Sequence, residues 1–249
     1  FNEYSFVCGA TGGKCKPLVA SDDTKPQQVG ALAINNAGVV AGYTRHDGLR
    51  QATRWDGGVP TVLPPLVNAK RPLWSSAYAV TRSGDVVGAG YTHPQLVKMH
   101  GAIWSNGGVT MLPNFDDVGS GSAYTANDQG LIVGWAQEPV AHLVHAVYWQ
   151  DQAIHDITPA GATAQAFAVD GSGRMAGCGN MFGADHAFLR GTDGALQDLG
   201  VLAGHASSCA TGMNDAGQTV GWSQAQSDDF PNPTRRGVLR PAPPDTSRR

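Results

Sequence analysis

The chain has few charged residues and no excess of either sign. Charged side chains make up 15% of its 249 residues, and the formal net charge is −3. A nucleic acid or an anionic membrane surface is held by a field of positive charge, so we expect no nucleic-acid partner. No apolar run approaches the ~18 to 20 residues that cross a bilayer, and we therefore expect no membrane insertion.

The chain also lacks the short motifs of several common catalytic and cofactor sites. It contains no Gly-x-Ser-x-Gly, no His-Glu-x-x-His and no glycine-rich phosphate loop before a helix. His142 and His145 form a His-x-x-His pair, which is a weak zinc signal, and the four cysteines lack Cys-x-x-Cys spacing. We therefore expect no metal and no cofactor.

Glycine, by contrast, is abundant and recurs at a fixed period. Among the 33 glycines, one in each repeat follows a turn rich in Asn, Asp or Ser, and this glycine recurs at steps of 46, 46, 43 and 44 residues. A second glycine always lies four residues after it. The recurring turn glycines are Gly38, Gly84, Gly130, Gly173 and Gly217. A period of about 45 residues is typical of β-propeller blades.

Each repeat predicts four short antiparallel strands, which we call a to d in chain order. Strands a and b flank the turn glycine, strand c holds segments such as His145-Ala-Val-Tyr-Trp149, and strand d follows a short turn. We predict one all-β domain over 1–249, a five-bladed β-propeller of four-stranded antiparallel blades. The repeats cover approximately 30–67, 74–116, 121–161, 164–204 and 208–240.

The two ends of the chain are incomplete in complementary ways. Residues 3–20 match strands c and d, whereas the last repeat lacks a clear strand d. N-terminal strands that complete the last blade would close the ring, because a single blade cannot bury both of its faces. One surplus strand c near Arg240 has no assigned place, and an open solenoid is the alternative architecture.

The fourth repeat contains His186-Ala187-Phe188, followed by Asp198-Leu199-Gly200. With this signature the repeat resembles the bacterial HAF-repeat family of predicted extracellular repeat proteins. The resemblance extends from about residue 4 to 240 and implies secretion and a propeller-like β fold, but no agreed activity. Two repeats depart from the pattern at the histidine, with Gln51 and Arg236 in its place.

The four cysteines fit two disulfides. Cys8 and Cys15 lie close together in the N-terminal hairpin, and Cys178 and Cys209 are expected to meet where one repeat gives way to the next. An even number of cysteines in a lysine-poor chain suits an oxidising compartment. The sequence therefore predicts a secreted or periplasmic protein, and we expect a monomer.

Function is predicted on the face of the ring that carries the long, non-repeating loops between strands b and c and between strands d and a. Aromatic side chains beside polar groups there suit a glycan or an extracellular protein. The candidate ligand-binding residues are Trp74, Phe230, Tyr91, Arg71, Arg45, His46, Trp135 and Trp222. For Trp135 and Trp222, and for Tyr43 at the same repeat position, packing between blades is the alternative.

An enzyme remains the alternative to a binding module. Glycoside cleavage needs two carboxyl groups that face an open funnel, and an extracellular hydrolase or lyase would take them from the same loops. The candidate catalytic residues are Asp116, Asp117, Glu138, Asp228, Asp229, His93 and His142. A rigid spacer without a ligand is a third interpretation.

Overall fold

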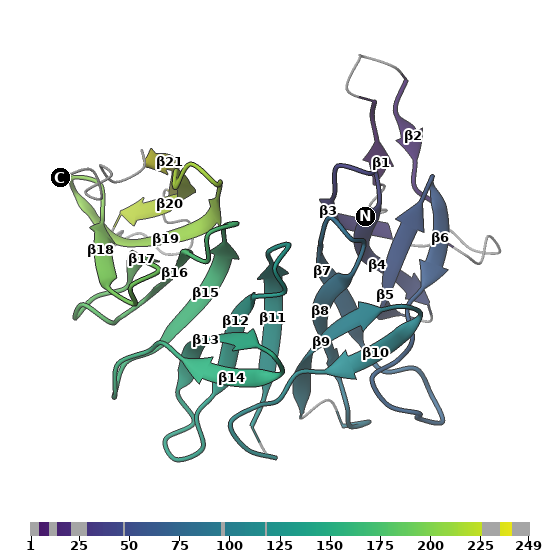
Figure 1. Cartoon of the computed structure of the whole chain (residues 1–249), viewed down its shortest axis with the longest axis horizontal. Helices are drawn as coiled ribbons and strands as arrows, with labels where there is room; N and C mark the ends of the chain where they lie inside the picture. Colours follow the sequence, from purple (N-terminus) through teal and green to yellow (C-terminus); the bar gives the residue numbers. More distant parts are fainter. Residues whose placement is uncertain are drawn as a thin grey trace. The chain divides into compact units, whose positions relative to one another are not determined.

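The chain is all-β in the part that the structure, a computed structural model, describes (Figure 1). The described residues are 5–9, 14–20, 29–46, 48–95, 98–117, 119–225 and 235–240. Asp228, Asp229 and Phe230 lie outside them, as does the side chain of His46. Within these ranges no helix is long and apolar enough to span a membrane.

The strands form successive antiparallel sheets in chain order (Figure 1). Sheet 1 contains β3 (Val29–Ile34), β4 (Val40–His46), β5 (Leu49–Asp56) and β6 (Val59–Val62). Sheet 2 contains β7 (Ser75–Val80), β8 (Val86–Tyr91), β9 (Met99–Ser105) and β10 (Gly108–Met111). Sheet 3 contains β11 (Gly121–Ala126), β12 (Ile132–Gln137), β13 (Val144–Gln150) and β14 (Ala153–Asp156).

The remaining sheets continue the same order. Sheet 4 contains β15 (Ala164–Val169), β16 (Met175–Gly179), β17 (His186–Arg190) and β18 (Leu196–Gly200). Sheet 5 contains β19 (His205–Met213), β20 (Thr219–Ala225) and β21 (Arg235–Arg240), and a short hairpin at the N-terminus contains β1 (Phe6–Val7) and β2 (Lys16–Pro17). The predicted all-β architecture of repeated four-stranded antiparallel sheets is confirmed.

The chain divides into two compact units between Asp128 and Gln129, and each is described by itself. Unit 1 holds the N-terminal hairpin and sheets 1 and 2, and unit 2 holds sheets 4 and 5. The dividing point falls in the turn between β11 and β12.

The two glycines of each repeat have different structural roles. The turn glycine has a left-handed backbone, with a φ of 90° at Gly173, as the a–b turn requires. The second glycine, such as Gly177, lies so close to the neighbouring strand a that a Cβ atom at this position would overlap a backbone carbonyl oxygen of that strand. At this point strand a has a β-bulge, with the register shifting between Ala166 and Ala168.

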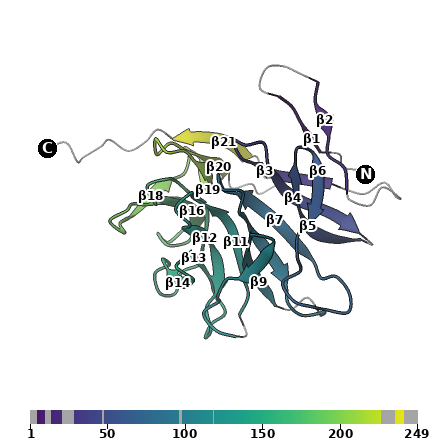
Figure 2. The ribbon, with the colours of Figure 1, turned by 45° about the vertical axis from the view of Figure 1, so that its right-hand side comes forward.

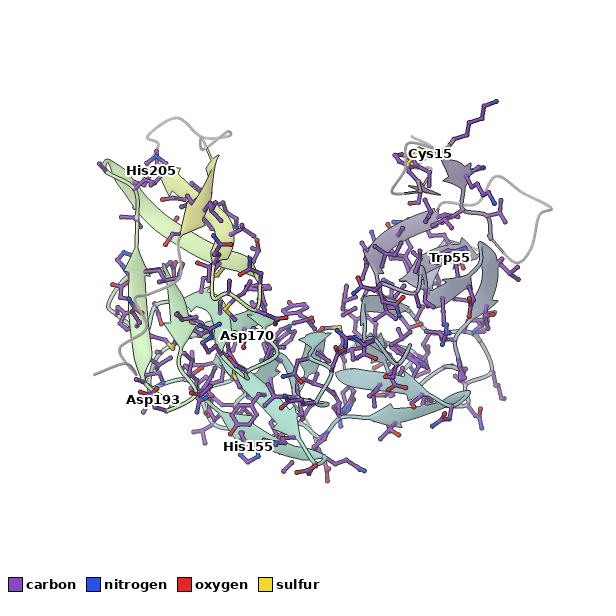
Figure 3. The ribbon with its side chains drawn as sticks, turned by 45° about the horizontal axis from the view of Figure 1, so that its top comes forward. Cys15, Trp55, His155, Asp170, Asp193 and His205 are labelled. Atoms are coloured by element: carbon purple, nitrogen blue, oxygen red, sulfur yellow. A yellow bond between two sulfur atoms is a disulfide. The ribbon has the colours of Figure 1, made fainter. Side chains whose placement is uncertain are left out.

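The N-terminal hairpin repeats the contacts of strands c and d. The Leu18 N–H donates to the Ser5 carbonyl, as Leu63 N–H donates to Ala52 in sheet 1, and both bonds measure 2.8 Å. The Trp55 indole donates to the Val19 carbonyl at 2.7 Å. Figures 2 and 3 show the hairpin beside sheet 1, with Cys15 and Trp55 in the same part of the molecule. The first strands of the chain therefore cover sheet 1 as a preceding sheet would.

Burial of apolar side chains between consecutive sheets holds each unit together. Trp55 is fully buried with Leu18, Val29 and Val40, and Phe188 is fully buried in a cluster that includes Met175. Burial of such large side chains contributes on the order of 2 to 3 kcal/mol each. The tryptophans of strand c also lie in the core, since Trp55, Trp104 and Trp149 are 0, 3 and 1% exposed.

Both predicted disulfides are present. Cys8 bonds to Cys15 within the N-terminal hairpin, and Cys178 on β16 bonds to Cys209 on β19. The second closes a segment with a sequence separation of 31 residues, for which loop-closure entropy corresponds to about 3 to 4 kcal/mol. The Cys178–Cys209 bond therefore fixes β16 of sheet 4 against β19 of sheet 5.

Candidate functional site

Unit 2 contains an open pocket of about 520 Å³ that is lined by sheets 4 and 5 and by the first residue of β13 in sheet 3. A volume of this size accommodates a ligand of about one to two sugar rings. The lining residues are Val144, Thr163, Ala164, Gln165, Phe167, Cys178, Gly179, Asp185, Ser207, Ser208, Trp222 and Gln224. We call this set the aromatic pocket.

The two aromatic rings of the pocket come from repeat features of the fold. Phe167 is the extra residue of the bulge in β15, between Ala166 and Ala168, and a bulge redirects a side chain that regular pleating would place in the sheet face. Trp222 follows the second glycine of its repeat on β20, where it pairs with Cys209. Both rings are half-buried, so part of each surface remains available to a ligand.

The framework between the two rings is cross-linked. The Cys178–Cys209 disulfide lies among the residues of the pocket, since Cys178 pairs with Gln165 and Cys209 with Trp222. The Ser208 hydroxyl accepts the Ala187 N–H at 2.8 Å and donates to the Gly200 carbonyl at 2.6 Å. A pocket wall held by covalent and hydrogen bonds loses little entropy when a ligand binds.

Polar groups surround the aromatic rings of the pocket. Gln165 and Gln224 contribute amides, which both donate and accept hydrogen bonds, and Asp185 contributes an exposed carboxylate. The Asp185 carbonyl accepts the Ser208 N–H at 2.9 Å, which fixes the backbone of this loop. Among the described lining residues Asp185 is the single carboxylate.

The predicted ligand-binding residues are separated by the structure. Trp74 and Tyr91 meet in unit 1, with ring centroids 5.6 Å apart in an edge-to-face arrangement. Arg71 borders a different pocket of unit 1, and Arg45 lies at the end of β4 opposite Arg50. In unit 2, Trp222 lines the aromatic pocket, whereas Trp135 on β12 is not among its lining residues.

Tyr43 illustrates the packing alternative for the residue after the second glycine. Its ring is 5% exposed and covers Gly30, where a Cβ atom would collide with it. The Arg50 guanidinium lies 4.1 Å from the centre of the ring. Tyr43 is therefore a core residue, while Trp222 at the equivalent position is half-buried at a pocket.

The candidate catalytic residues within the described ranges make local backbone contacts. Glu138 accepts N–H bonds from Val140, at 3.0 Å, and from Ala141, and these bonds lower the pKa of its carboxyl. Asp116 accepts the Gly119 N–H at 2.6 Å, and the Asp117 carbonyl accepts the Lys98 ammonium.

The two candidate histidines also lie in loops. His93 accepts the Gln95 N–H through Nδ1 at 3.2 Å. His142 lies in the b–c loop rather than on a strand, with a left-handed φ of 56°. His142 and His145 therefore do not share a strand, because β13 begins only at Val144.

The repeated histidines of strand c bind the neighbouring strand d. His145 Nδ1 lies 2.7 Å from Asp156 Oδ2, and His186 Nδ1 lies 2.9 Å from Asp198 Oδ2. In sheet 2 burial lowers the pKa of His100, whose Nδ1 faces Asn114 at 3.4 Å. Within the described ranges no three His, Cys, Asp or Glu side chains gather as metal ligands would. The histidines thus join strands c and d.

The bulge residues of strand a are functional candidates that sequence reasoning overlooked. Tyr78 occupies the same position as Phe167, and its ring centroid lies 5.7 Å from that of Tyr124 within unit 1. Burial raises the pKa of the Tyr78 hydroxyl, more than the charge of Arg50 lowers it. Their signal in the sequence is a large residue between two small ones in strand a.

Repeated antiparallel sheets, most of them of four strands, define an all-β repeat protein. A solved structure of a puromycin-hydrolyzing peptidase from Mycobacterium tuberculosis superposes on 96% of the chain with a TM-score of 0.62 and 13% sequence identity. The chain spans 44% of the length of that peptidase. At this identity the likeness concerns the fold alone. No family model and no curated protein matches the chain.

Proposed function

We propose that the protein is a glycan-binding module whose ligand occupies the aromatic pocket. The observation that carries the proposal is the pairing of two half-buried rings, Phe167 and Trp222, with the amides of Gln165 and Gln224 in one open pocket. A sugar presents apolar C–H faces edged with hydroxyl groups, which suit a ring face flanked by groups that donate and accept. A protein partner is the outcome that would contradict this choice.

The small number of carboxylates at the pocket favours binding over cleavage. The two carboxyl groups of a glycoside hydrolase lie about 5 to 10 Å apart across the scissile bond. The aromatic pocket contributes Asp185 alone among its described lining residues. Glu138, the one candidate acid among the described residues of unit 2, accepts hydrogen bonds from backbone N–H groups of its own loop.

A panel of soluble polysaccharides, scored both for retention of the protein and for shortening of the polymer, tests the proposal. We expect retention without shortening, and Trp222→Ala should weaken it at least tenfold, or about 1.4 kcal/mol. Trp135→Ala is the matched control, because Trp135 has the same repeat position outside the pocket, and it should bind normally. Shortening that disappears in Asp185→Asn would show a hydrolase or lyase instead.

We further propose that the repeats close into a five-bladed β-propeller through the N-terminal hairpin. In sheet 4, Ala176 and Leu189 are 0% and 5% exposed because sheet 5 covers them. The equivalent residues of sheet 5, Val220 and Leu239, are 47% and 65% exposed. In unit 1, Phe6 is 64% exposed although its hairpin packs as strands c and d do. These apolar side chains would cover each other in a closed ring.

Small-angle scattering tests ring closure. A compact domain of 249 residues has a radius of gyration of about 18 Å. We expect this value for the closed ring and a clearly larger one for an open solenoid. In a closed ring, replacement of the exposed apolar pair by Val220→Ser with Leu239→Ser should increase the radius of gyration. In an open solenoid the same double change would leave the radius of gyration unchanged.

Two disulfides are typical of proteins from oxidising compartments, and they support a proposed secreted or periplasmic location. We also propose membership of the HAF-repeat family, on the His-Ala-Phe and Asp-Leu-Gly signature of sheet 4. That signature has a physical role here, since its histidine and aspartate are the His186–Asp198 pair. The proposed partner is an extracellular glycan, and the proposed state is a monomer.

A further inference from the structure

Sheet 1 departs from the repeat at the contact between strands c and d. In sheets 3 and 4 this contact is a histidine–aspartate pair, His145–Asp156 and His186–Asp198. The register places Val62 opposite Thr53 in sheet 1, as Asp156 lies opposite Val147 in sheet 3. The equivalents in sheet 1 are therefore Gln51 and Val62, which cannot form an ion pair.

A second departure of sheet 1 lies beside the first. The loop from strand d to the next strand a spans 63–74, against 112–120, 157–163 and 201–204 after sheets 2, 3 and 4. Leu66 and Leu73 anchor this long loop, because each is 9% exposed. Three prolines, Pro64, Pro65 and Pro72, restrict the backbone of the loop further.

The two departures meet at a pocket of about 250 Å³ in unit 1. The lining residues are Gln51, Val62, Leu63, Pro65, Val67, Asn68, Ala69, Arg71, Pro72, Leu73 and Ser75. Most of this wall is apolar, and the Ser75 hydroxyl is already occupied by the Ala52 N–H at 2.9 Å. We call it the sheet 1 pocket. This pocket exists because sheet 1 has Gln51 and Val62 where sheets 3 and 4 have a histidine and an aspartate, and because the loop above these residues is longer.

The charge at the sheet 1 pocket has one sign. Arg71 is exposed at the pocket and Lys70 precedes it, while the described lining residues of the pocket include no acidic residue. Arg71 takes part in none of the ion pairs between described residues. A guanidinium at the edge of an apolar pocket is suited to bidentate binding of a carboxylate.

We propose that the sheet 1 pocket binds a small monocarboxylate with an apolar body, either as a free acid or as the C-terminal residue of a peptide. The carboxylate pairs with Arg71, the apolar body contacts Val62, Leu63 and Leu73, and the Gln51 amide bonds any polar group at the inner end. At ~30 Å³ per water-sized group, the pocket holds about eight non-hydrogen atoms. Hexanoate has this size and chemistry. This site is separate from the proposed glycan site and does not depend on it.

Titration of the protein with hexanoate, followed by the fluorescence of Trp74 at the end of the loop and by NMR, tests the proposal. We expect saturable binding with a Kd on the order of 1 mM or below. Hexylamine should not bind. A pentapeptide that ends in a free leucine carboxylate should bind, and its C-terminal amide should not, if the source is a peptide; binding of hexanoate alone indicates a free acid.

Two variants locate the binding. Arg71→Gln should raise the Kd for hexanoate at least tenfold, and Arg82→Gln, an exposed arginine that pairs with Asp128 elsewhere, should leave it unchanged. The double variant Gln51→His with Val62→Asp introduces the pair of sheets 3 and 4, so it should fold normally by circular dichroism and lose hexanoate binding. No saturable binding, an equal Kd in Arg71→Gln, or equal binding of hexylamine would overturn the proposal.

Discussion

Gly177→Ala is expected to destabilise the protein by at least ~3 kcal/mol or to prevent folding. An alanine Cβ at Gly177 would lie closer than 3.0 Å to the Gln165 carbonyl oxygen and to the Ala166 Cα. Both are backbone atoms of strand a, so a rotamer change cannot relieve the clash, and the bulge with its Phe167 would have to move. Urea unfolding of the purified variant measures the loss.

The turn glycine of the same repeat provides the matched control. Gly173 has a φ of 90°, but a Cβ there meets no atom within 4 Å. Gly173→Ala should therefore cost only the left-handed backbone energy, about 1 to 2 kcal/mol. Equal effects at Gly173 and Gly177 would contradict the close approach of strands a and b that we infer from the second glycine.

Asp170→Ala is expected to cost about 3 kcal/mol. Asp170 closes the a–b turn of sheet 4 (Figure 3), and its side chain is fully buried. Its Oδ1 accepts the N–H groups of Ser172 and Arg174, and its Oδ2 lies 2.6 Å from the Arg174 Nε. Alanine would leave these donors without their acceptor at a partly buried turn. Thermal or urea unfolding measures the difference.

Asp170→Asn separates the contribution of the Asp170 charge from that of its hydrogen bonds to the turn. Asn35 at the same position of sheet 1 accepts the N–H groups of Ala37 and Val39 through Oδ1, each at 3.0 Å. The asparagine variant should therefore keep the turn and lose the pairing with Arg174, at a cost of about 1 to 2 kcal/mol. A loss as large as that of Asp170→Ala would show that the charge, rather than the turn, carries the effect.

The contribution of Asp170 should depend on pH. Burial by itself raises the pKa of the carboxyl, but hydrogen bonds from Ser172 and Arg174 and the Arg174 charge outweigh it, so the pKa is lowered. A lowered pKa in the folded state stabilises the fold above the unfolded pKa of about 3.9, and this stability is lost as the pH falls through the folded-state pKa. The stability difference between wild type and Asp170→Asn should shrink below pH 4, and a constant difference would contradict this assignment.

Much of the fold could be predicted from local patterns. The turn glycines, such as Gly173, and the short alternating strands predict antiparallel hairpins because both depend on neighbouring residues in the chain. The pairings of Cys178 with Cys209 and of Cys8 with Cys15 followed from the repeat register, which carries information across tens of residues. The His-Ala-Phe motif likewise gave a structural role for His186, which bonds to Asp198.

The functional residues were harder to predict, because a repeat position does not determine exposure. Tyr43 and Trp222 follow equivalent glycines, yet one is 5% exposed over Gly30 and the other lines a pocket beside Cys209. Which occurs depends on the neighbouring residue across the strand, a glycine or a disulfide-bonded cysteine. The direction of Phe167 depends on a bulge, whose position follows from the fit of two strands.

The sequence by itself determined the five repeats, their strands and their disulfide partners, because glycine geometry, strand alternation and cysteine spacing act locally or repeat with the period. Only the tertiary structure decided which side chains form pockets. The Gln51 and Val62 substitutions and the 63–74 loop lie apart in the sequence and meet only when sheet 1 folds. Departures from the repeat are visible in the sequence, but whether they lie next to each other in space depends on how the strands and loops pack.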